Sequence, residues 1–70
     1  MTINLGALVR VTNCPHRSGH YGRVSTLGER VGVRFPPLAV CRSAVEASAA
    51  LNDSQHGGWA AYESVNLEVV

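Results

Sequence analysis

Arginine supplies every Lys or Arg charge in this 70-residue chain, and three arginines have a spacing that could serve binding. Arg10, Arg23 and Arg34 each lie in a stretch where apolar and polar residues alternate, which is typical of a half-buried strand. We expect all three on one outer face. Guanidinium groups match phosphate oxygens, so this face predicts binding to RNA or DNA. The alternative is a solvated face whose arginines splay apart or pair with Glu63 or Glu68.

The net charge of +1 conceals an uneven distribution along the chain. Residues 1–42 contain all six arginines and one acidic residue, whereas residues 43–70 contain four acidic residues and neither Lys nor Arg. This asymmetry predicts an electropositive face, or two halves of a domain that neutralise each other. Dedicated nucleic-acid-binding domains are usually far more basic, so RNA or DNA binding is the second hypothesis, behind protein binding.

A polar segment, residues 13–20, contains a second group of candidate binding residues. Its Pro15 and Gly19 predict a loop. Loops often carry binding residues, so one interpretation is that His16, Arg17 and His20 form a rim that faces a ligand. The alternative is a polar loop with a buried cysteine.

The same segment also raises the questions of metal binding and catalysis. Cys14, His16 and His20, with Cys41 or His56, have the chemistry of zinc ligands, but their spacing matches no standard zinc finger. A Cys14–His16 pair could form a thiolate and an imidazolium, but no third orienting residue is evident. We therefore expect no metal, no cofactor and no enzymatic activity.

Length and composition favour one small domain, residues 1–70, because two cores would each be too small to fold. No apolar run approaches the roughly 20 residues of a membrane helix. The N-terminus lacks a basic segment followed by an apolar one, so we expect a cytoplasmic protein in which Cys14 and Cys41 are reduced.

The elements that must position these residues are mainly β. Gly28-Glu29 predicts a two-residue type II′ hairpin turn, which would place Arg23 opposite Arg34 and Leu27 opposite Arg30. A strand edge is predicted at residues 38–41, and a tight turn at residues 64–65. The expected strands are residues 7–12, 21–27, 30–35, 59–63 and 66–70.

One helix is predicted within this β-rich pattern. Ser43 and Glu46 have the spacing of a capping box, in which the serine caps the helix and the glutamate reaches back to it. Alanine-rich sequence follows, so a short helical insertion is expected at about residues 43–52.

Two stretches of the chain, residues 6–35 and 59–70, carry a pattern of glycine, aliphatic and aromatic residues. It consists of Gly6-x-x-Val9-x-Val11, Gly19-x-Tyr21-Gly22-x-Val24, Val31-x-Val33-x-Phe35 and Tyr62-Glu63-x-x-Asn66-Leu67-Glu68-Val69. This pattern resembles the KOW motif and the Src-homology-3-like barrels that it opens. The resemblance implies a five-stranded barrel that binds RNA or a protein. The loop before Gly22 has His16, Arg17 and His20 where the motif usually has lysines, and the insertion at 36–58 is longer than the motif needs.

Spare apolar side chains favour an interface with a protein partner or a second copy. Trp59 and Tyr62 lie three residues apart, so a strand would bury one and expose the other. Leu8, Leu27 and Leu38 are also candidates for the interface. The leading hypothesis is a non-enzymatic module for protein interaction or assembly.

Overall fold

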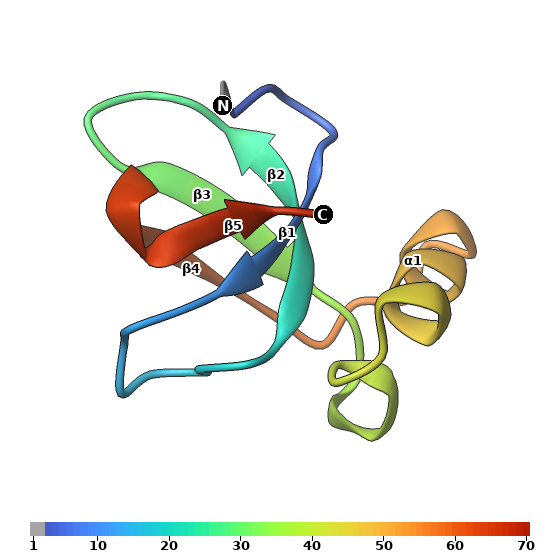
Figure 1. Ribbon diagram of the computed structural model, residues 1–70. Helices are drawn as coiled ribbons and strands as arrows, with labels where there is room; N and C mark the ends of the chain where they lie inside the picture. The colour runs from blue at the N-terminus through green and yellow to red at the C-terminus, as the bar shows by residue number, and fades with distance from the viewer. Residues whose placement is uncertain (1–2) are drawn as a thin grey trace.

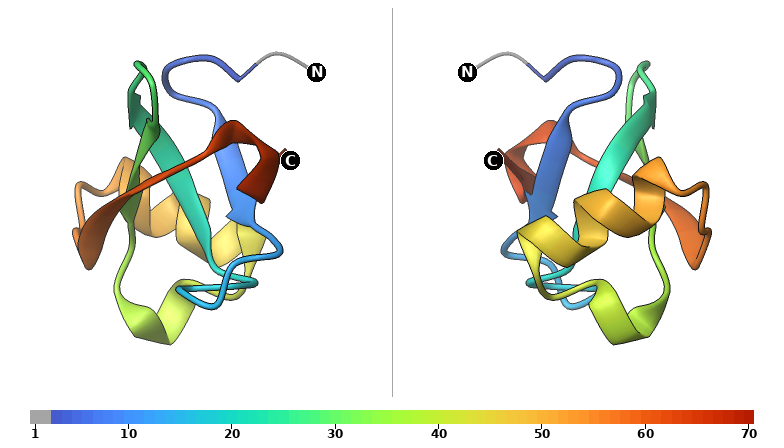
Figure 2. Two further views of the ribbon diagram at one scale, coloured as in Figure 1. Left: turned by 90° about the vertical axis from the view of Figure 1, so that its left-hand side faces the viewer. Right: turned by 90° about the vertical axis from the view of Figure 1, so that its right-hand side faces the viewer.

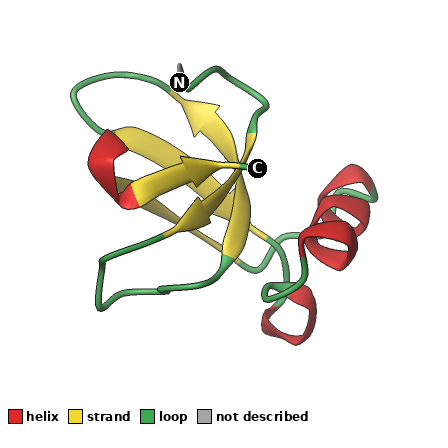
Figure 3. Cartoon of the chain, in the orientation of Figure 1, coloured by secondary structure: helices red, strands yellow, loops and turns green. Residues whose placement is uncertain are grey.

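The structure is a computed structural model, and it describes residues 3–70 as a mainly β fold (Figure 1; Figure 3). The predictions of five strands and of a helix at about residues 43–52 are confirmed. The elements are β1 (Leu8–Val11), β2 (Tyr21–Thr26), β3 (Val31–Phe35), η1 (Leu38–Val40, a 3₁₀ turn), α1 (Ala44–Asn52), β4 (Gly58–Tyr62), η2 (Ser64–Asn66, a 3₁₀ turn) and β5 (Leu67–Val69).

The five strands form one antiparallel sheet in the order β4-β3-β2-β1-β5. Figure 2 shows that this sheet is strongly twisted. Strands β4 and β5 do not pair with each other, so hydrogen bonding within residues 3–70 does not close the sheet. Strand β4 is therefore one edge of the sheet and β5 is the other.

Alternation along the strands places one face of each strand in the core. Val9 and Val11 of β1 are almost fully buried, as are Val33 and Phe35 of β3. Burial of such side chains is the main contribution to the stability of a small domain, at about 1.5–3 kcal/mol each. The buried cluster comprises Val9, Val11, Val24, Val31, Val33, Phe35, Tyr62 and Leu67.

Gly22 of β2 is required by close packing. A Cβ atom at this position would lie 2.5 Å from Cγ1 of Val33 and 2.8 Å from the carbonyl oxygen of Arg34. Any side chain would therefore push β3 away from β2, whereas glycine lets the two strands bend together over the core.

The connection between β2 and β3 differs from the predicted type II′ turn. Arg23 does lie opposite Arg34, but the register shifts after Val24, and Thr26 then pairs with Gly32. This bulge lengthens the connection to residues 27–30. Gly28 also lacks the positive φ that a type II′ turn needs, so that prediction was wrong, as was the pairing of Leu27 with Arg30.

The insertion between β3 and β4 begins with a turn where a strand edge was predicted. Residues 38–40 form η1, in which the Val40 N–H donates to the carbonyl of Pro37 (3.0 Å). The hydroxyl of Ser43 then caps α1 by accepting from the Glu46 N–H (3.3 Å). The Ser43 N–H donates to Val40, so only the serine half of the predicted capping box is formed.

The packing at Gly22 generates a prediction with a matched control. Gly22→Ala should lower the free energy of unfolding by about 1–3 kcal/mol, because the methyl group overpacks the β2–β3 contact. At Gly28 a Cβ atom would meet only a carbonyl oxygen at 3.8 Å, so Gly28→Ala should be neutral or stabilising by up to about 1 kcal/mol. Urea denaturation of both variants measures the difference, and equal destabilisation would contradict the packing argument.

Candidate functional site

The outer face of the sheet is the face that carries Arg23 and Arg34. A cross-strand row on this face runs from Leu8 through Arg23 and Arg34 to Trp59. Arg10 is outside this row because it lies opposite Tyr21 and Glu68. The structure therefore brings two of the three predicted arginines together and places the third in a neighbouring row.

Arg23 is used to fasten the helix to the sheet. Its Nη1 donates to Oδ1 of Asn52 (3.0 Å) and its Nη2 donates to Oγ of Ser48 (2.9 Å), so α1 is held across β2. Like charges directly opposite each other are destabilising. The hydrogen bonds to α1 give the Arg23 guanidinium polar partners next to Arg34. The same bonds make this guanidinium less available to a ligand.

Arg10 and Arg34 have different environments. Arg10 forms an ion pair with Glu68 (Nη2 to Oε1, 3.5 Å), and both side chains are exposed enough that the pair contributes at most about 1 kcal/mol. Arg34 makes no hydrogen bond or ion pair with any side chain of residues 3–70. Of the predicted triad, only Arg34 presents a guanidinium without a side-chain partner among the residues that the structure describes.

In the loop of residues 13–20, Arg17 covers the end of the core. Its guanidinium carbon lies 4.5 Å from the centre of the buried Phe35 ring, a cation–π contact. A Cβ atom at Gly58 would lie 2.6 Å from Nη2 of Arg17, so glycine makes room for this side chain. Arg17 has φ +61, a conformation that side chains other than Asn and Asp rarely adopt.

His16 and Tyr62 form a second aromatic contact at the same end. Their ring centroids are 6.4 Å apart, and the Tyr62 hydroxyl donates to the carbonyl of His16 (3.2 Å). Burial raises the pKa of Tyr62, and the neighbouring Cys14 adds to this effect. Tyr62 also meets Phe35 edge-on, at 6.0 Å between ring centroids.

His20 is buried without a hydrogen-bond partner for Nδ1 within residues 3–70. Burial lowers the pKa of its imidazole, and the positive charges of Arg42 and Arg17 lower it further, with a smaller contribution from His16. The predicted loop residues therefore do lie close together. His20 points into the protein and His16 is exposed, so they do not form one rim.

The residues of the predicted zinc alternative do not come together. Within residues 3–70, no group of three or more His, Cys, Asp or Glu side chains could hold a metal ion. Cys14 and Cys41 are both free thiols, and the Cys41 thiol donates to the carbonyl of Leu38 (3.1 Å).

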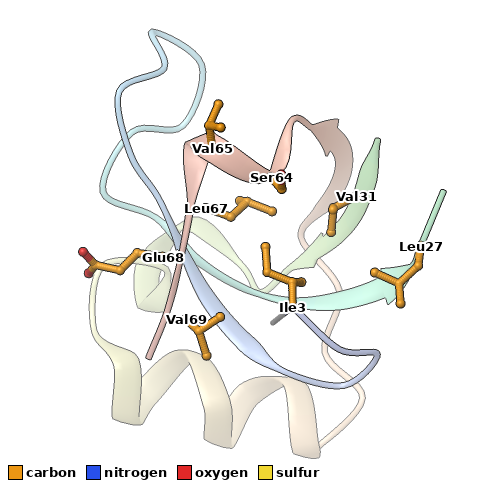
Figure 4. A pocket seen from close by; sticks show the side chains of 8 residues that line it. All are labelled: Ile3, Leu27, Val31, Ser64, Val65, Leu67, Glu68 and Val69. Atoms are coloured by element: carbon orange, nitrogen blue, oxygen red, sulfur yellow. The ribbon is translucent and has the colours of Figure 1, made fainter. Parts of the chain in front are cut away.

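An apolar groove lies at the end of the sheet near the β2–β3 connection (Figure 4). Its volume is about 550 Å³, and Figure 4 shows the side chain of Ile3 between those of Leu27, Leu67 and Val69. Leu27 is 51% exposed and Val65 is 78% exposed, so aliphatic surface remains open to solvent at the rim. The lining residues are Ile3, Leu27, Val31, Ser64, Val65, Leu67, Glu68 and Val69.

The predicted interface residues occupy separate places. Leu27 lines the groove, whereas Leu8 lies beside α1 in a smaller hollow. Leu38 is exposed on η1, and Trp59 is exposed on the outer face. Tyr62 is buried, as expected for one of the pair Trp59 and Tyr62, and has no surface to offer an interface.

The sequence arguments missed Ile3 and Val65 as surface candidates. Both lie outside the strands, where the alternation of apolar and polar residues gives no information. The signal that could have identified them is the presence of an aliphatic residue in a segment outside the strands, where polar residues usually predominate.

Comparisons with protein families, curated proteins and solved structures give no match for this chain. None of the helices within residues 3–70 has the length and apolar character needed to span a membrane.

The role of Arg23 can be tested against Arg34. Arg23→Ala should lower the free energy of unfolding by about 1–3 kcal/mol, because it removes both charged hydrogen bonds to α1. Arg34→Ala, which removes no such bond, should change it by no more than about 0.5 kcal/mol. Chemical denaturation followed by circular dichroism measures both, and the reverse order would refute this assignment.

The buried His20 predicts a pH dependence of stability. Its folded pKa is below the ordinary value of 6.5, so the unfolded chain binds a proton more readily than the folded chain. The contribution of His20 to the free energy of unfolding should be constant above pH about 6.5, should fall as the pH drops from there to the folded pKa, and should level off below it. His20→Gln should reduce this slope, whereas replacing the exposed His56 should preserve it. An unchanged slope in His20→Gln would exclude His20 as its source.

Proposed function

We propose that this protein is a non-enzymatic protein-binding module that holds an aliphatic segment of its partner in the apolar groove. The observation that carries this proposal is the open groove itself, with Leu27 and Val65 exposed at its rim. Its volume of about 550 Å³ is within the usual range for binding sites. Covering one large aliphatic side chain contributes about 1.5–3 kcal/mol, so burying this surface under a partner would add to the affinity.

We also propose that the fold belongs to the KOW-type, Src-homology-3-like barrels. The five antiparallel strands and the tight closing turn η2 before β5 support this proposal. So does Gly22, the motif's glycine, at a position where β3 leaves no room for a side chain. Barrels of this class include modules that dock onto larger complexes, which agrees with protein binding.

The distribution of the arginines favours protein binding over nucleic-acid binding. Arg10 is paired with Glu68, Arg17 covers Phe35 and Arg23 holds α1. Engaging a phosphate with any of these three would give up a contact that the fold uses. RNA or DNA binding through Arg34 is therefore the second candidate, and it has less support.

Selection of peptides from a random phage-displayed library tests the groove. The immobilised protein should enrich peptides that contain aliphatic residues, and the double variant Leu27→Asp/Val65→Asp should bind these peptides at least about tenfold more weakly. The reason is that two carboxylates at the rim must be desolvated when an apolar peptide binds.

Val45→Asp is the matched control, because Val45 is 80% exposed on α1 and lies outside the groove. It should retain the affinity of the parent protein. Peptides that bind both charged variants equally well would exclude the groove. Retention of the parent protein on an oligonucleotide column at low salt, lost in Arg34→Ser, would favour the second candidate.

A further inference from the structure

Among the described residues 3–70, strand β4 is an edge strand without the usual protection. Edge strands are normally short, charged, bulged or covered, because their free backbone groups can pair with another chain. The other edge, β5, has three residues with Glu68 at its centre. Strand β4 has five residues, Gly-Trp-Ala-Ala-Tyr, with no charge and no proline.

The register identifies which backbone groups of β4 are free. Val24 exchanges backbone hydrogen bonds with the segment before β1, so the backbone groups of its neighbour Arg23 point the other way, toward Arg34. The backbone groups of Arg34 point toward Arg23, so they form no hydrogen bonds with Trp59 on the other side of β3. The N–H and C=O of Trp59 must therefore point away from β3. By the same alternation, the N–H and C=O of Ala61 also point outward.

The indole of Trp59 is held away from this edge. Its Nε1 donates to Oγ of Ser25 on β2 (2.9 Å), and a Cβ atom at Gly32 would lie 2.6 Å from Cζ2 of the ring. The ring therefore extends back over β3 toward β2. The Trp59 side chain therefore does not cover the outward backbone groups of Trp59 and Ala61. Leaving these groups uncovered does not stabilise an isolated chain.

We propose that a second copy of this chain pairs with this edge, β4 against β4, antiparallel about a twofold axis at Ala60. New hydrogen bonds can join only residues whose backbone groups point outward, namely Trp59 and Ala61. An axis at Ala60 places Trp59 opposite the partner's Ala61, and the symmetry also places Ala61 opposite the partner's Trp59. Each of these two pairs can exchange N–H···O bonds.

Free backbone groups favour this register over its neighbours. With the axis at Ala60, Trp59 lies opposite the partner's Ala61, and both residues have outward backbone groups. An axis at Trp59 would set Ala61 against the partner's Gly57, whose N–H already donates to Phe35 (2.7 Å). An axis at Ala61 would set Trp59 against the partner's Glu63, whose carbonyl already accepts from Asn66 (2.9 Å).

Ala61→Pro tests the pairing in solution. Light scattering over an approximately hundredfold range of concentration should show the parent mass rising from 7.4 kDa toward twice that value. Proline at residue 61 removes only an outward N–H, so the contacts with β3 should survive and the dissociation constant should rise at least about tenfold. If circular dichroism shows that Ala61→Pro is unfolded, Ala61→Lys provides the same test with a charge at the edge.

Cysteine cross-linking tests the register. In a non-hydrogen-bonded antiparallel pair the Cα atoms are about 4.5 Å apart, a separation that a disulfide spans, so Ala60→Cys should form a covalent dimer on oxidation. Ala61→Cys is the control, because its partner residue in this register is Trp59. The parent chain, with only Cys14 and Cys41, should also stay uncross-linked.

Several results would overturn the proposal: a parent protein that is monomeric at every concentration, a dimer unaffected by Ala61→Pro and Ala61→Lys, or cross-linking through residue 61 in place of residue 60. The groove contains no residue of β4, so Leu27→Asp/Val65→Asp should leave the dimer intact. Failure of the groove proposal and failure of the edge proposal are therefore distinguishable.

Discussion

The packing around Phe35 is the constraint on which most of the structure depends. Its ring is fully buried, meets Tyr62 edge-on and lies beneath the guanidinium of Arg17. A Cβ atom at Gly22 would come within 3.0 Å of it. One side chain thus joins β2, β3, β4 and the loop of residues 13–20. Together with Val33 and the carbonyl oxygen of Arg34, this ring leaves no room for a side chain at Gly22.

The size of the chain explains why its arginines serve the fold. A domain of 70 residues buries a smaller fraction of its surface than a larger domain, so polar side chains must help to cover the core. Arg17 closes one end of the core over Phe35, and Arg23 holds α1 against β2. A charge pattern that predicts a phosphate-binding face can therefore arise from structural needs, since sequence alone does not show what each guanidinium contacts.

The sequence was most informative where the rules are local. The alternation around Val9 and Val33 follows from the period of a strand, and the cap at Ser43 follows from the chemistry of a helix start. The turn after Thr26 was mispredicted because a bulge changes the register without changing the composition of the strand. The groove could not be predicted, because Ile3 and Val65 meet only through the tertiary fold.

The two edges of the sheet differ in a way that folding alone does not require. Glu68 at the centre of β5 forms an ion pair with Arg10 on the neighbouring strand β1. This edge of the sheet is therefore charged. None of the six arginines or five acidic residues lies in β4, where a single charge would discourage pairing without disturbing the core. The indole of Trp59 is also tied back to Ser25 and does not extend over the edge. A chain that must remain a monomer would gain from a lysine at position 61, and the alanine found there leaves the backbone of β4 open to a second strand.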